Sequence, residues 1–89
     1  MGRYLREAKH HAERIDYYHE YAGPLGYQQA EYHFHRLQGL VGRAGRSKND
    51  KSDVAPILAL RDAARAKMEK MAQSRDDWAS RSKGQSPGG

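Results

Sequence analysis

The amino-acid sequence predicts an all-α fold, a small three-helix bundle built on an antiparallel helical hairpin with a longer third helix. Three segments carry apolar residues at helical spacing, and turn-forming residues separate these segments. Valine and isoleucine are rare, which argues against β-strands. The chain has 89 residues, which suits a single helical domain. We assign residues 1–79 to this domain and residues 80–89 to a disordered Gly/Ser/Pro tail.

Two helices are expected over residues 3–22 and 27–44. The segment 23–26 (GPLG) separates them, because proline cannot continue a helix and glycine favours turns. In both helices apolar residues recur at alternating steps of three and four, the spacing of helices that share a seam. The seam residues are Leu5, Ala8, Ala12, Ile15, His19 and Ala22 in the first helix, and Tyr27, Ala30, Phe34, Leu37, Val41 and Ala44 in the second.

A chain that folds back at Pro24 sets Leu5 against Ala44 and Ile15 against Phe34 along this seam. One flank of the hairpin is also partly apolar and consists of Tyr4, His11, Tyr18, Leu25, His33 and Leu40. The opposite flank is polar and carries Lys9, Asp16, Glu31 and Gln38. We therefore expect the third helix to cover the tyrosine and histidine flank.

The third helix is expected over about residues 53–79, after a polar loop over residues 45–52. Asp53 is a candidate N-cap for this helix, and Pro56 is tolerated in its first turn. A looser apolar stripe follows, made of Val54, Ile57, Leu60, Ala64, Met68, Met71 and Trp78. Trp78 either closes the bundle or forms an exposed anchor. In an alternative arrangement this helix extends away from the hairpin and forms a homodimer.

Net charge indicates the kind of partner. Lys and Arg number 16 against 11 Asp and Glu, which gives a charge of +5. This balance favours acidic protein surfaces or nucleic acid, although acids are interspersed throughout. No apolar run is long enough for a membrane span, and the start lacks the apolar stretch of a secretory signal. We expect a cytoplasmic protein without membrane contact. The alanine- and arginine-rich, cysteine-free composition is compatible with a phage or plasmid origin.

Patterns typical of catalysis are absent from the sequence. It has no cysteine nucleophile, no HExxH zinc motif and no nucleophile elbow, so we expect no enzyme, no catalytic residue and no cofactor. No two of the five histidines are three or four residues apart, which is the spacing that metal ligands on one helix need. We expect no metal site, and a pair across the hairpin such as His19 with His33 is the remaining possibility.

Tyrosines are concentrated in the first third of the chain, and four of the six lie near the turn. Tyrosine is frequent at binding hot spots, because it combines a large contact area with a polar tip. Tyr17 and Tyr32 lie farthest from the seam and are expected to be exposed. Packing at the edge of the core is expected for Tyr18, Tyr21 and Tyr27. The predicted protein-contact residues are Tyr17, Tyr21, Tyr32 and His35.

Residues 42–51 (GRAGRSKNDK) combine glycines with basic residues. Glycines allow backbone amides to approach a phosphate, and basic side chains neutralise it. The predicted contacts with phosphate or an acidic surface are Arg43, Arg46, Lys48 and Lys51. The order of a Walker loop is absent, and a solvated loop after a glycine C-cap is the alternative.

These observations favour a non-enzymatic protein-binding module, a small regulator or inhibitor. It would dock a basic, tyrosine-rich helical surface on a larger partner protein that is acidic or handles nucleic acid. The first alternative is direct nucleic-acid binding through residues 42–51. The second alternative is a structural homo-oligomer.

Overall fold

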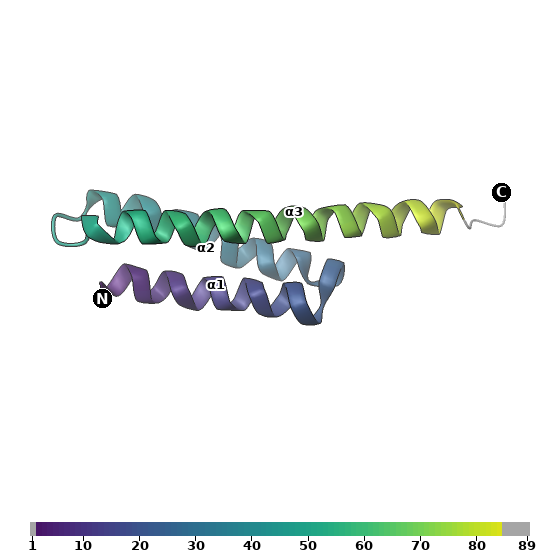
Figure 1. The fold of residues 1–89 in the computed structure, drawn as a ribbon, viewed down its shortest axis with the longest axis horizontal. Helices are drawn as coiled ribbons and strands as arrows, with labels where there is room; N and C mark the ends of the chain where they lie inside the picture. The colour runs from purple at the N-terminus through teal and green to yellow at the C-terminus, as the bar shows by residue number, and fades with distance from the viewer. Residues whose placement is uncertain (1, 85–89) are drawn as a thin grey trace.

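The computed structural model describes residues 2–84, with side chains as far as residue 74. Three α-helices, α1 (Arg3–Tyr21), α2 (Tyr27–Arg46) and α3 (Val54–Gly84), are joined by the short 3₁₀ helices η1 (Gly23–Gly26) and η2 (Lys51–Asp53). They pack as an elongated bundle of 61 × 20 × 15 Å, in which α3 lies along the hairpin of α1 and α2 and continues past its closed end (Figure 1). The predicted all-α three-helix fold is confirmed.

Two glycines make the tight turn of the hairpin. Gly23 has a φ of +55°, a left-handed conformation that residues with a side chain rarely adopt. Gly26 is buried where α1 meets the turn. A Cβ atom there would lie 2.8 Å from the Cβ of Ala22 and 3.0 Å from that of Tyr18. The predicted break at residues 23–26 therefore depends on both the conformational freedom and the small size of glycine.

The core follows the predicted apolar spacing of all three helices. Its largest fully buried side chains are Ile15 from α1, Leu37 from α2, and Ile57 and Met71 from α3. Small residues complete the core and allow the helices to approach, and these are Ala8, Ala30, Ala44 and Ala64. Trp78 lies beyond the last described side chain.

The third helix covers the opposite side of the hairpin from the one that we expected. Lys67 of α3 forms an ion pair with Asp16 of the polar flank. The Arg65 guanidinium lies 5.9 Å from the ring centre of Phe34. The prediction that the third helix covers the tyrosine and histidine flank is therefore wrong.

That flank instead lies along the contact between α1 and α2. His11 and His33 approach within 2.9 Å, and Gly26 lies against Tyr18. Each helix of the hairpin buries the face that was predicted. On each of them, however, α3 and the other hairpin helix lie on the opposite flanks from those expected. The seam residues are the same in both arrangements, and the uneven polarity of the two flanks did not determine where α3 packs.

Asp53 does not cap α3 as predicted, because it lies in η2 and its carboxylate points to α1. Its Oδ2 atom accepts a hydrogen bond of 3.2 Å from the backbone amide of Leu5, in the first turn of α1. Asp53 is only 5 % exposed, and it occupies the space beside Gly2 that a Cβ atom would need. The carboxylate therefore holds the start of α1 against the start of α3.

Two helix ends differ from the prediction. Helix α2 continues to Arg46, so the connecting loop is shorter than residues 45–52. Helix α3 continues to Gly84 rather than ending near residue 79, and it includes the first part of the expected tail. The rest of that tail, residues 85–89, lies outside the described residues.

Candidate interaction surface on the helical hairpin

The hairpin has one face directed away from α3, which we call the outer face. It comprises the rows that repeat every seven residues from Arg3, Tyr4 and Glu7 on α1 and from Gln29, Tyr32 and His33 on α2. These rows hold five arginines, five tyrosines and three histidines, but a single acid, Glu7. The other acids of the hairpin lie outside these rows and are Glu13, Asp16, Glu20 and Glu31. Folding therefore concentrates aromatic and positively charged side chains on one side.

A chain of aromatic rings crosses the outer face from α1 to α2. Tyr21 contacts Tyr17 with ring centres 5.1 Å apart, and Tyr17 contacts Tyr18 at 5.4 Å. Tyr18 stacks on His33 at 6.1 Å, and His33 meets Tyr32 at 5.1 Å. The half-buried Tyr18 and His33 thus contact the exposed Tyr17 and Tyr32, and Tyr17 contacts Tyr21, which restrains these rings before any partner binds.

Arg14 links this chain of rings to positive charge. Its guanidinium carbon lies 4.8 Å from the ring centre of Tyr17 and 5.2 Å from that of Tyr18. An Nη2 group of Arg14 also donates a hydrogen bond of 3.2 Å to the Tyr18 hydroxyl. These contacts hold a cation among the rings, at the place where a partner would touch the exposed tyrosines.

A histidine pair lies in the middle of the outer face. The Nδ1 atoms of His11 and His33 are 2.9 Å apart, so that one ring donates a hydrogen bond and the other accepts it. Burial lowers the pKa of both imidazoles below 6.5, and the nearby charge of His10 further lowers that of His11. Glu7, 4.0 Å from His11 Nε2, acts in the opposite direction. Both rings are therefore neutral near pH 7.

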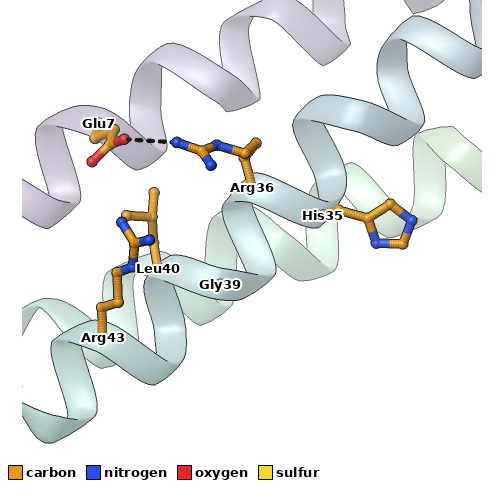
Figure 2. Close-up of a pocket in the computed structure, with 6 residues that line it drawn as sticks. All are labelled: Glu7, His35, Arg36, Gly39, Leu40 and Arg43. Carbon is orange, nitrogen blue, oxygen red and sulfur yellow. Dashed lines mark ion pairs between the residues drawn. The ribbon is translucent and has the colours of Figure 1, made fainter.

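The other end of the outer face contains a small basic pocket between α1 and α2 (Figure 2). Arg36 reaches across from α2 to Glu7 on α1, and its Nη2 atom lies 4.0 Å from the Glu7 carboxylate. Arg43 rises from the same side of α2, beside the buried Leu40. The outer face therefore has an aromatic end near the turn and a basic end toward the start of α1.

The structure places three of the four predicted protein-contact residues on the outer face. Tyr17, Tyr21 and Tyr32 are 46 %, 71 % and 59 % exposed. The exposure of Tyr17 and Tyr32 is as predicted, whereas the prediction that Tyr21 packs against the core is wrong. His35 lies apart from the tyrosines, because it lines both a groove between α2 and α3 and the edge of the basic pocket.

The four predicted phosphate or acidic-surface contacts are exposed but do not form one cluster. Arg43 lines the basic pocket with Arg36. The Arg46 guanidinium folds back over Gly42, where a Cβ atom would lie 3.2 Å from its Nη1 atom. Lys48 and Lys51 lie in the exposed connection between α2 and α3. The first half of the predicted Gly/Arg loop, residues 42–46, thus belongs to the end of α2.

Sequence reasoning missed Arg14, Arg36, Glu7 and the pairing of His11 with His33. The positions of these five residues in the heptad pattern were visible, since all of them lie in or beside the partly apolar flank. We did not select them, since we expected α3 to cover the flank that contains His11 and His33. Placing that flank between α1 and α2 would have brought both histidines to the contact between these helices, where the structure pairs them.

The described residues contain no group of three or more His, Asp or Glu side chains positioned to hold a metal ion. Nor does any helix, within the part of the chain that the structure describes, have the length and apolarity needed to span a membrane. Comparisons with protein families, with curated proteins and with solved structures find no match to this chain. Functional inference therefore rests on the geometry of the outer face.

Proposed function

We propose that the protein is a non-enzymatic protein-binding module, a small regulator or inhibitor that docks its outer face on an acidic surface of a larger partner. The observation that carries this proposal is the ring chain from Tyr21 to Tyr32, in which exposed tyrosines contact half-buried rings and are flanked by arginine. Rigid aromatic side chains bind with a small loss of conformational entropy, which is the property of hot-spot residues.

Charge supports an acidic partner. Apart from Glu7, the charged side chains on the outer face are all positive, and the whole chain has a charge of +5. A surface of one sign accelerates encounter with the opposite sign and disfavours partners of like charge. The proposed partner is a larger protein that presents an acidic surface or that handles nucleic acid.

The experiment is capture of a partner from nuclease-treated lysate of the source cells on the immobilised protein. The parent chain should retain a defined partner, and the Tyr17→Ala/Tyr32→Ala variant should lose it with its helicity unchanged. The control variant Glu31→Ala/Lys70→Ala removes two exposed charges of opposite sign outside the outer face, and it should retain the partner. Equal retention by both variants would exclude the tyrosine surface.

Direct nucleic-acid binding is the second candidate, because tyrosines and arginines interleave on the outer face as they do on surfaces that stack bases. A mobility-shift titration tests it. Nucleic-acid binding predicts affinity better than roughly 10 μM that falls steeply between roughly 50 and 200 mM salt. Absence of a shift at low salt would exclude this candidate.

A further inference from the structure

The basic pocket on the outer face has an uneven balance of charge. Arg36 faces Glu7 at 4.0 Å, and their side chains are 47 % and 42 % exposed, so this ion pair is long and solvated. Arg43 lines the same pocket and forms no ion pair with any described residue. The pocket is therefore lined by two arginines and one carboxylate, together with His35.

The backbone keeps this pocket open. Arg36 and Arg43 lie two turns apart on the same side of α2, and Gly39 lies between them. A Cβ atom at Gly39 would have no other atom within 4 Å, so nothing covers the space between the arginines. Leu40, only 2 % exposed, forms an apolar floor that excludes water from one side. Both arginines line the pocket, and Figure 2 shows their side chains extending from the same side of α2 toward α1.

Glu7 indicates which anion fits. Its carboxylate already faces Arg36, but the neighbouring Arg43 has no carboxylate of its own. Arginine binds carboxylates through paired N–H groups in a fixed geometry, and it prefers short contacts to the 4.0 Å separation found here. An incoming carboxylate that approached more closely would therefore displace Glu7 from Arg36.

We propose that the basic pocket binds the carboxylate of an aspartate or glutamate of the partner protein, held by Arg36 and Arg43 in place of Glu7. This inference rests on the proposed function for the identity of the partner, and it adds a second anchor to the tyrosine end of the same face. Glu7 acts as an internal competitor that occupies Arg36 while no partner is bound.

The probe for this site is a short fluorescent poly-glutamate peptide, titrated into the full chain at low salt and followed by anisotropy. Arg43→Ala should weaken binding by about fivefold, as expected for loss of one partly exposed charge contact. Glu7→Gln should strengthen it, because the competing carboxylate is gone. Lys48→Ala removes the same charge as Arg43→Ala from an exposed position outside the pocket, and it should have a much smaller effect.

Two results would overturn the proposal. The first is an equal loss of peptide affinity for Arg43→Ala and Lys48→Ala, with no gain of affinity for Glu7→Gln, since binding would then reflect net charge alone. The second is tighter binding of an oligothymidylate of equal charge with the same residue dependence, which would assign the pocket to phosphate. The peptide binds without the partner protein, so its titration tests the pocket alone. Failure to capture a partner is therefore distinguishable from failure of the pocket to bind the peptide.

Discussion

The paired imidazoles of His11 and His33 are sensitive to protonation because of their surroundings. A hydrogen bond between the two Nδ1 atoms needs one protonated nitrogen and one lone pair, so two charged rings cannot form it. The groups around the pair on α1 and α2 are mostly cationic, namely His10, Arg14 and Arg36, with Glu7 as the one acid. A proton added to either imidazole is therefore repelled by these groups, and only Glu7 offsets the repulsion.

We predict that acid weakens the folded state through this pair. Because burial lowers the folded pKa of both rings below 6.5, the unfolded chain binds more protons than the folded one as the pH falls. The contribution to stability should be complete above about pH 6.5 and be lost as the pH falls through the lowered pKa values. Urea unfolding between about pH 7.5 and 5.5, above the carboxylate range, measures this decline.

The His11→Gln/His33→Gln variant should remove most of the decline, because glutamine does not titrate. His35→Gln, at an exposed position outside the pair, should keep it. A parent chain whose free energy of unfolding is constant over this range would contradict the prediction, as would an unchanged decline in the double variant.

Asp53 also shows how a single residue joins elements that are distant in sequence. Its position just before an apolar stripe suggested an N-cap, and that chemical role is retained in the structure. The amide that donates a hydrogen bond to this carboxylate is that of Leu5 in α1 instead of an amide of α3. A carboxylate seeks free amides at any nearby helix start, and which helix start is near is a tertiary property.

Among the elements, α2 and the turn before it contain glycines in two contrasting environments. Gly26 lies where η1 contacts α1, with Cβ atoms of Ala22 and Tyr18 closer to its own missing Cβ than side chains tolerate. Gly39 lies in the middle of α2 with open space around it. The same substitution should therefore have opposite effects at the two positions.

We predict that Gly26→Ala destabilises the protein by about 1–3 kcal/mol, because the new methyl group forces α1 away from the turn. Gly39→Ala should stabilise it by about 0.5–1 kcal/mol, because alanine loses less backbone entropy in a helix. Denaturant unfolding of both variants under identical conditions gives the comparison. Effects of the same sign at both positions would show that the close approach at Gly26 is not maintained in solution.

For the molecule as a whole, the side on which α3 packs determines which surface remains free. With α3 over Asp16 and Phe34, the arginine and tyrosine rows face outward. With α3 over His11 and Tyr18, as the sequence pattern favoured, the histidine pair and the ring chain would be buried under it. The candidate site therefore exists because of this one choice between two packing arrangements.

Thiol cross-linking tests that arrangement, because the chain contains no cysteine of its own. We predict that Asp16→Cys/Lys67→Cys is cross-linked within one chain by a short bismaleimide, since the parent side chains form an ion pair. Arg14→Cys/Lys67→Cys places one thiol on the outer face, where α3 does not reach. Mass spectrometry of the digested monomer identifies the cross-link. Preferential cross-linking of the Arg14→Cys variant would indicate the opposite arrangement.

Sequence reasoning succeeded where a residue's environment depends on its own helix. Ile15, Leu37 and Ile57 are fully buried as the apolar spacing predicts, and Tyr17 and Tyr32 are exposed because they lie opposite the seam. It did not predict the pairing of His11 with His33, because that contact depends on which neighbouring helix lies on each side. The spacing of apolar residues along one helix does not indicate which neighbouring helix packs on which side.

The spacing of apolar residues by itself determined three helices, the turn at residues 23–26 and the buried arc of each helix, because burial of that arc is the main favourable term in folding. It also placed tyrosines and arginines on the remaining surface. Only the tertiary structure decided which flank α3 covers, and therefore that tyrosine, histidine and arginine share an open face. The two arrangements bury similar apolar arcs. Contacts between distant residues, such as Lys67 with Asp16 and Asp53 with Leu5, accompany the arrangement that forms.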